Sequence, residues 1–323
     1  MPDWLIEEGI GEHRAVRLAG GRIVEARVDW LGSMSAGHIA EATLVSRAAG
    51  SARGTVRLAS GEEALVDRLP RDASEGAPLR VEIVRAAIGE RGRSKLAQAR
   101  PSDKPLASPT LAERRRAEGH DAKVVHRFAG DDWDDLAAEA LDGAVAFAGG
   151  SLLLAPTPGM TVIDVDGALR PRELALAAVA PLAETLRRFD LGGSIGIDFP
   201  TLEAKADRRA VDQALGAALA DWPHERTAMN GFGFVQLVAR LERPSLLHRT
   251  RLSRAGFAAR VLLRRAERVE APGALMLTCH PAVDAVLLPE WRDELVRRTG
   301  RIVQIATDPA LALEAGFAQA VAV

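Results

Sequence analysis

Two short apolar segments that each end in aspartate constrain the fold of this chain most strongly. Residues 160–167 are Met-Thr-Val-Ile-Asp-Val-Asp-Gly, and residues 192–199 are Gly-Gly-Ser-Ile-Gly-Ile-Asp-Phe. Both segments have the length and composition of buried strands. Residues 171–191 between them predict a helix, with Pro171 in its first turn and a glycine pair after its end. A right-handed strand–helix–strand unit of this size brings the carboxyl ends of both strands to one edge of a parallel sheet.

The aspartates of these strands are therefore expected close together. Strand side chains alternate between faces, so Asp164 and Asp166 share one face of the first strand, and Asp198 ends the second. Ligands of open α/β sheets bind at this edge. Clustered carboxylates repel one another unless a cation lies between them, and their hard oxygens suit Mg²⁺ or Mn²⁺. The alternative is that these aspartates cap loops or pair with arginines, the usual role of a single aspartate at a strand end.

Composition excludes several classes of protein. The chain has 323 residues, of which 47% are apolar, and this predicts a globular protein of two or three domains. No segment approaches the ~18 apolar residues of a membrane span, and residues 1–8 lack the pattern of a secretory signal. We therefore expect a cytoplasmic protein without a membrane partner. The single cysteine, Cys279, excludes an internal disulfide and a cysteine-rich zinc site. It is expected to be a buried strand residue, the alternative being a nucleophile.

Charge is segregated although the net charge is only −2. Residues 81–130 carry eleven Lys and Arg against six Asp and Glu, and residues 226–270 carry ten arginines against three glutamates. Such segments indicate contact with a polyanion, the alternative being a solvated basic face. The seven histidines are scattered without the spacing of metal ligands.

The rest of the pattern predicts a multidomain α/β protein. Residues 3–30 alternate as paired strands around the turn Gly20-Gly21. Short, evenly spaced strands in residues 36–100 predict a small barrel of the OB type. Residues 101–109 have linker composition, and a basic helix (111–118) and an acidic helix (131–141) follow. A hairpin then leads into the first aspartate strand, and residues 254–323 form a small α/β domain.

This order of elements and motifs resembles the ribonuclease E/G family. The resemblance is strongest over residues 151–246 and weaker in the N-terminal hairpin and the C-terminal tail. Its motifs include Ile-Asp-Val-Asp-Gly (163–167), Leu-Gly-Gly (191–193), Ile-Asp-Phe (197–199), Arg-Ala-Val (209–211), Phe-Gly-Phe-Val (232–235) and Arg-Pro-Ser-Leu (243–246). No single motif is decisive, but their order along the chain is fairly specific.

The resemblance implies an architecture and an activity. The expected parts are an N-terminal hairpin of an RNase H-like subdomain (1–33), an OB-type RNA-binding barrel (34–100), a linker with short helices (101–142), the RNase H-like remainder with a DNase I-like catalytic subdomain (143–253), and a small C-terminal α/β domain (254–323). The implied activity is Mg²⁺-dependent cleavage of single-stranded RNA, leaving a 5′-phosphate and a 3′-hydroxyl.

The resemblance also assigns roles to residues. Asp164 and Asp198 are the expected catalytic metal ligands, and Asp166 is a third ligand where the family usually has asparagine. The expected RNA contacts come from the basic segments and from the motif around Phe232: Arg91, Arg93, Lys95, Arg114, Arg115, Arg116, Arg226, Phe232 and Arg240.

Several departures from the family pattern qualify these expectations. The zinc-binding cysteines expected after Leu246 are missing, so we expect no structural zinc, and any homo-oligomer is not bridged by zinc. The segment between the barrel and the catalytic strand is too short for a full 5′-end sensor. Residues 31–98 contain no Phe, Trp or Tyr, so the barrel lacks rings on which bases stack.

Two further departures leave an alternative function open. Gly231 stands where the family has a basic residue, and residues 236–239 are Gln-Leu-Val-Ala instead of Glu-Met-Thr-Arg. The alternative is therefore a non-catalytic RNA-binding relative. A metal-dependent phosphoesterase of small substrates is a third class, which the barrel and the basic segments disfavour.

Overall fold

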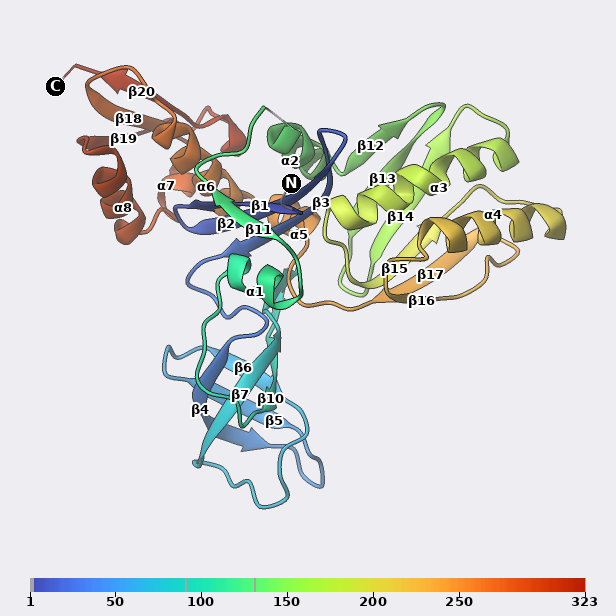
Figure 1. Ribbon diagram of the computed structural model, residues 1–323, viewed down its shortest axis with the longest axis horizontal. Helices are drawn as coiled ribbons and strands as arrows, with labels where there is room; N and C mark the ends of the chain where they lie inside the picture. Colours follow the sequence, from blue (N-terminus) through green and yellow to red (C-terminus); the bar gives the residue numbers. More distant parts are fainter. Residues whose placement is uncertain (1–2, 91, 131, 323) are drawn as a thin grey trace.

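The computed structural model describes residues 3–90, 92–130 and 132–322. Within these ranges the chain is a mixed α/β protein with a central N-terminal sheet, a closed barrel, a six-stranded sheet backed by helices, and a small C-terminal sheet (Figure 1). The barrel projects from the N-terminal sheet at the bottom of Figure 1, and the six-stranded sheet and the C-terminal sheet lie on opposite sides. No helix in the described ranges is long and apolar enough to cross a membrane.

The N-terminal sheet confirms the predicted hairpins and adds a strand. Its members, in spatial order, are β11 (Ala122–Val125), β1 (Trp4–Gly9), β2 (Glu12–Ala19) and β3 (Arg22–Trp30). Gly20 and Gly21 form the β2–β3 turn with positive φ angles, a conformation that glycine adopts without strain. Helix α1 (Leu111–Ala117) buries Leu111 and Ala112 against this sheet. The basic helix predicted at residues 111–118 is therefore confirmed, and it packs on the N-terminal sheet.

The predicted barrel is a closed five-stranded barrel. Its strands, in order around the barrel, are β10 (Ala97–Pro101), β6 (Glu63–Val66), β5 (Gly54–Leu58), β4 (Ile39–Arg47) and β7 (Pro78–Arg85). Its core consists of aliphatic side chains such as Leu44, Val56, Val81 and Ile83, all of them buried. Between β7 and β10 the chain forms a small hairpin, β8 (Ile88–Glu90) and β9 (Arg93–Lys95), that the sequence did not predict.

The six-stranded sheet contains both aspartate strands. Its members, in spatial order, are β12 (Ala144–Phe147), β13 (Gly150–Pro156), β14 (Thr161–Gly167), β15 (Gly193–Asp198), β17 (Phe234–Ala239) and β16 (His224–Arg226). Strands β14 and β15 are parallel neighbours joined by helix α3 (Pro171–Arg188), so the predicted strand–helix–strand unit is confirmed. All other neighbours in this sheet are antiparallel.

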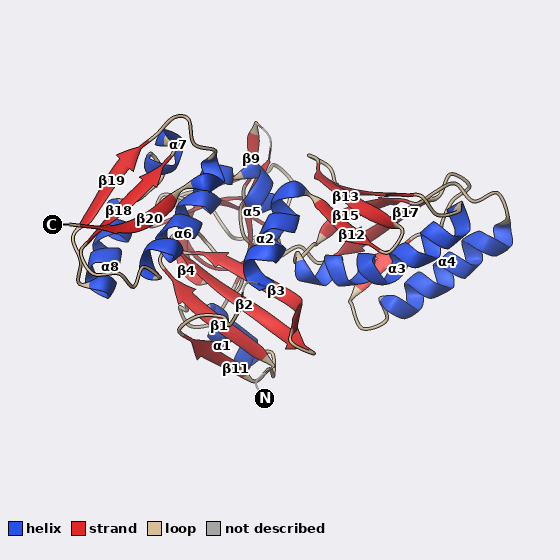
Figure 2. Ribbon diagram, turned by 90° about the horizontal axis from the view of Figure 1, so that it is seen from above, coloured by secondary structure: helices blue, strands red, loops and turns tan. Residues whose placement is uncertain are grey.

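Helices cover only one face of this sheet. Helix α3 and helix α4 (Lys205–Ala218) lie on the same side of it (Figure 2). Beneath them the inward side chains Ile163, Ile195, Ile197, Val235 and Leu237 are fully buried. The alternate residues face the other side, which we call the open face: Ser151, Leu153, Val162, Asp164, Asp166, Ser194, Gly196, Asp198, Phe234, Gln236 and Val238.

The remaining helices join the parts. Helix α2 (Asp132–Asp142) buries Trp133 and Leu136 in the main core and packs on α5 (Leu246–Leu252). Helix α6 (Arg254–Glu267) packs on the C-terminal sheet. That sheet and its helices comprise β19 (Val303–Thr307), β18 (Ala274–Cys279), β20 (Phe317–Val321), α7 (Pro281–Asp284), α8 (Pro289–Thr299) and a 3₁₀ turn (Leu313–Ala315). Cys279 is fully buried in β18, as the sequence predicted.

Candidate metal centre and substrate surface

Asp164 and Asp198 are direct neighbours on the open face. The parallel register of β14 and β15 pairs Asp164 with Asp198. Adjacent strands lie about 4.8 Å apart, so two side chains that leave the same face at paired positions bring their carboxylates close together. Both side chains are exposed, because the open face carries no covering layer at this point. The shared sheet edge predicted for these two residues is thus what the structure shows.

The electrostatics of the pair show mutual repulsion. The pKa of Asp164 is raised, first by partial burial and then by the negative charges of Asp198 and Asp166, against a backbone hydrogen bond at Val165. Within the described ranges, no Lys, Arg or His lies within ion-pair distance of any of these three aspartates. Nearby aspartates on α4 differ, since Asp207 and Asp212 each pair with an arginine. The alternative role as arginine partners is therefore not the one that the structure shows.

Asp166 lies farther along β14 than the pair. Its side chain faces the same way, opposite Ser151, and one carboxylate oxygen accepts a hydrogen bond of 2.8 Å from the backbone N–H of Gly167. No group of three or more Asp, Glu, His or Cys side chains in the described part of the chain is arranged to hold a metal ion. Two carboxylates with water completing the shell is nevertheless an ordinary way to bind Mg²⁺. The residues present fit such an ion at Asp164 and Asp198.

A tight turn before β17 presents Phe232 next to this pair. The side-chain carbonyl of Asn230 accepts hydrogen bonds from the backbone N–H groups of Phe232 (2.9 Å) and Phe234 (3.1 Å). Gly233 has a φ of 89°, and a Cβ there would overlap the carbonyl oxygen of Phe199. Phe232 lies in this turn and is 81% exposed. The Asn-Gly pair at 230–231 is a turn signal in the sequence, but its side-chain hydrogen bonds were not predicted.

Strand β17, on the other side of β15 from β14, contributes Gln236 to the open face. Gln236 pairs with Gly196 across β15 and β17, and its amide donates a hydrogen bond of 3.1 Å to Ser194 Oγ. Phe234 and Met160 lie over the position that a Cβ of Gly196 would occupy. The surface around Gly196 is therefore neutral, and the negative charges of the open face lie on the three aspartates and on Glu225, the β16 partner of Val238.

The arginines of helix α1 make hydrogen bonds and ion pairs with other residues of the protein. Arg114 donates to the carboxylate of Asp29 and, at 2.7 Å, to the carbonyl of Pro109. Arg115 is buried 5.4 Å from the ring centre of Trp4 and pairs with Glu118.

Arg116 of the same helix is exposed, but it donates two hydrogen bonds, of 3.1 and 2.9 Å, to the carbonyl of Ala122. These three residues fasten α1 to the N-terminal sheet. RNA binding by these arginines stays a prediction, and their described contacts are structural.

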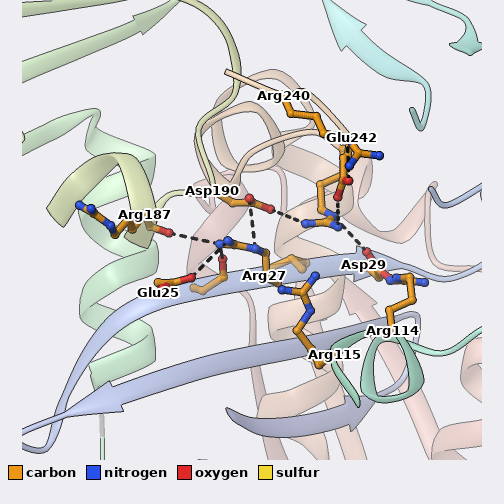
Figure 3. A network of polar contacts seen from close by, with 12 residues as sticks. Glu25, Arg27, Asp29, Arg114, Arg115, Arg187, Asp190, Arg240 and Glu242 are labelled. Atoms are coloured by element: carbon orange, nitrogen blue, oxygen red, sulfur yellow. Dashed lines mark hydrogen bonds and ion pairs between the residues drawn. The ribbon is translucent and has the colours of Figure 1, made fainter. Parts of the chain in front are cut away.

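Arg114 and Arg115 belong to a larger polar network at the junction of three parts of the chain (Figure 3). The carboxylate of Asp190, which follows α3, forms two ion pairs. One is with Arg27 Nε of β3 at 3.3 Å, and the other is with Arg243 Nη1 of the loop after β17 at 3.2 Å. Burial alone would raise the pKa of Asp190, but Arg27 and Arg243 hold it below its usual range. The network therefore locks the six-stranded sheet onto the N-terminal sheet.

The remaining predicted RNA contacts lie at different places. Arg226 faces the helix-covered side, where it donates to the carboxylate (3.0 Å) and carbonyl (2.8 Å) of Asp212. Arg240 is 77% exposed but lies at the end of β17 away from the aspartate pair, next to Glu242 at 3.1 Å. Neither side chain is therefore beside Asp164 and Asp198.

The β8–β9 hairpin carries the last three predicted contacts. Lys95 pairs with Glu90 at 2.6 Å and donates to the carbonyl of Pro158, in the turn that leads into β14. The hairpin thus reaches the six-stranded sheet at the start of β14, whereas the aspartates lie towards its end. Arg91 lies outside the described residues, and of Arg93 only the backbone position opposite Glu90 is described.

Several cations on the barrel strands are paired with acidic side chains. Its ion pairs join Arg53 to Asp67, Arg57 to Glu63, Arg80 to Glu41, and both Arg100 and Lys104 to Glu82. Because these arginines already have acidic partners and the barrel has no aromatic residue, neither phosphate contacts nor base stacking is favoured on these strands.

Comparison with known proteins adds no family assignment. No family model matches the chain, and no curated protein matches it by sequence. The geometry of the open face therefore carries the functional argument.

Proposed function

We propose that this protein is a Mg²⁺-dependent endoribonuclease that hydrolyses single-stranded RNA at the Asp164–Asp198 edge of the open face. The observation that carries the proposal is the unpaired, mutually repelling carboxylate pair at the ends of two parallel strands. A bound Mg²⁺ would polarise the scissile phosphate and lower the pKa of an attacking water. The expected products carry a 5′-phosphate and a 3′-hydroxyl.

The protein's own residues have separate tasks in this proposal. Asp164 and Asp198 hold the cation and keep it at the exposed edge, where a phosphodiester can approach without a cavity. Asp166, one oxygen of which accepts a hydrogen bond from the Gly167 N–H, would add negative potential beside the ion. Mn²⁺ is expected to replace Mg²⁺, because both prefer oxygen ligands.

The proposed architecture follows the same family resemblance. In it, the closed barrel is an OB-type domain inserted in an RNase H-like subdomain formed around the N-terminal sheet, and the six-stranded sheet is the DNase I-like catalytic subdomain. We propose single-stranded RNA as the partner, a cytoplasmic location, and no zinc-bridged oligomer. What supports the architecture is the order of parts along the chain, with the barrel strands inserted after β3.

The test is cleavage of a labelled single-stranded RNA with Mg²⁺ and with EDTA. The unchanged protein should cleave only with Mg²⁺, and Asp198→Asn should remove cleavage while far-ultraviolet circular dichroism stays the same. Asp221→Asn is the matched control, since Asp221 is an exposed aspartate of the same subdomain that pairs with Arg187. Cleavage that survives EDTA or Asp198→Asn would refute the proposal.

A second candidate is a non-catalytic RNA-binding protein with the same fold. The observation that favours it is Gln236, which faces the open side two residues from the partner of Asp198 and carries no negative charge. In that case RNA is bound without cleavage in any divalent cation. Restoring the acidic residue with Gln236→Glu would then raise cleavage from none to detectable.

A further inference from the structure

Phe232 is the one exposed aromatic ring near the aspartate pair. In the described part of the chain, Phe232 (81%) and Phe317 (42%) are the exposed aromatic side chains, and Phe317 lies in the C-terminal sheet. The other rings lie largely in the cores or stack on buried arginines, as Trp30 does on Arg260. Single exposed apolar side chains are ordinary on protein surfaces, so the significance of Phe232 comes from its position beside the strand end that carries Asp198.

The backbone around Phe232 is held by more bonds than a surface turn needs. Besides the two bonds to the Asn230 side chain, the N–H of Gly233 donates to the carbonyl of Asn230, and the N–H of Asn230 donates to the carbonyl of Phe234. The N–H of Phe199 donates to the carbonyl of Gly233, which ties the turn to the end of β15. These hydrogen bonds hold the backbone of the turn in place, and the side chain of Phe232 is exposed.

The turn that carries Phe232 is hydrogen-bonded to the chain directly after β15, the strand that ends at Asp198. Phe234 is the cross-strand partner of Asp198, and Phe232 lies two residues before it, in the turn that the Asn230 side chain holds. A base on Phe232 would therefore lie near a phosphate held at the aspartate pair.

We propose that Phe232 is the base-stacking platform that selects unpaired nucleotides for this site, an inference that rests on the proposed function. The occupant is an unpaired nucleobase of single-stranded RNA next to the scissile phosphate. A base inside a duplex is covered on both faces by its neighbours, whereas an unpaired base can place one face on the ring. The barrel cannot supply this contact, because residues 31–98 contain no aromatic side chain.

This platform is sequence-tolerant. Every base has a face that stacks on an aromatic ring, and such contacts are lost by substitution to alanine without a change in hydrogen-bond readout. No charged side chain is needed at the platform, because stacking uses the face of the ring. The site therefore discriminates single strands from duplexes more than one base from another.

The test is binding of a fluorescent ten-nucleotide RNA, followed by anisotropy in the Asp198→Asn background so that no cleavage occurs. Phe232→Ala should weaken binding by at least fivefold, Phe232→Leu by less, and Phe232→Tyr by less than twofold. Phe317→Ala is the matched control and should leave affinity unchanged. An abasic site placed in turn along the RNA should, at one position, remove the difference in affinity between the parent protein and its Phe232→Ala variant.

The outcomes separate this inference from the proposed function. Equal affinity of the Phe232→Ala and Phe317→Ala proteins overturns the platform, even if the unchanged protein cleaves RNA. Weaker binding by Phe232→Ala supports the platform, even if no variant cleaves RNA and the proposed activity fails. A loss of affinity that is the same for single-stranded and duplex RNA also overturns it, because stacking requires an unpaired base.

Discussion

Replacing Asp198 with asparagine should change stability in opposite directions with and without a divalent cation. The paired positions of Asp164 and Asp198 put their carboxylates about 5 Å apart. Two unit charges at that distance repel by about 0.8 kcal/mol in water and about 3 kcal/mol at an effective dielectric constant of 20. Because both side chains are exposed, the repulsion should lie near the lower value, at about 1 kcal/mol.

In EDTA, Asp198→Asn removes this repulsion and should raise the free energy of unfolding by about 1 kcal/mol. In 10 mM Mg²⁺ the unchanged protein gains the binding free energy of the ion, about 1.4 kcal/mol for a dissociation constant of about 1 mM, and the variant does not. The variant should then be the less stable of the two proteins. Urea unfolding followed by circular dichroism measures both differences, with Asp293→Asn as the control, because Asp293 is an exposed aspartate that makes no ion pair or side-chain hydrogen bond among the described residues.

The pH dependence of stability in EDTA tests the direction of this effect independently. The pKa of Asp164 is raised in the folded protein, so the folded state favours the protonated carboxyl more than the unfolded state does. The stability that the Asp164 carboxyl contributes to the folded protein is therefore present at low pH, and it is lost as the pH rises through the raised pKa of Asp164. The advantage of Asp198→Asn should accordingly be largest at pH 7 and vanish near pH 3. An advantage that is absent at pH 7 in EDTA would refute the repulsion argument.

Three further predictions follow from the packing and the site. Gly233→Ala should destabilise the protein by more than about 1 kcal/mol in urea unfolding, because alanine resists the positive φ and its Cβ meets the Phe199 carbonyl; an unchanged midpoint would show that the turn yields. Arg264→Leu should cost about 3–5 kcal/mol, since it leaves Glu7 and Glu12 buried without this partner; a neutral effect in thermal unfolding would contradict this. Cleavage should be equally fast on RNA beginning with a 5′-monophosphate or a 5′-hydroxyl; a tenfold preference, about 1.4 kcal/mol, would reveal an end-binding pocket.

Lowering the pH should destabilise the protein through the buried cluster of Arg264, Glu7 and Glu12. Burial alone would raise the pKa of Glu12, but Arg264, Arg14 and Arg260 together hold it below the ordinary value of 4.5. The stability that this carboxylate contributes is therefore present above pH 4.5 and is lost as pH falls through the lowered pKa.

Local sequence patterns predicted the strands and helices whose partners are close along the chain. The unit β14–α3–β15 follows from alternation, Pro171 and the glycine pair, and it placed Asp164 beside Asp198 correctly. The closed barrel followed from evenly spaced strands with glycine turns. These features are set by periodicity and turn chemistry, which act within about twenty residues.

Contacts between distant segments were not predictable in the same way. Strand β11 pairs with β1 across more than a hundred residues of chain, and no local pattern marks it. The three consecutive arginines of α1 form a basic segment in the sequence, but their partners are Asp29, Trp4 and the Ala122 carbonyl. Whether an arginine binds a ligand or a neighbouring strand depends on tertiary packing, so a basic segment alone is weak evidence for RNA binding.

The proposed function requires that Asp164 and Asp198 together hold one divalent cation. Titration with Mn²⁺, followed by electron paramagnetic resonance of the free ion, tests it without any assumption about the substrate. The unchanged protein and Asp221→Asn should each bind one Mn²⁺ that Mg²⁺ displaces, and Asp164→Asn and Asp198→Asn should each lose it. Equal Mn²⁺ binding by all four proteins, or none by the unchanged protein, would contradict the account.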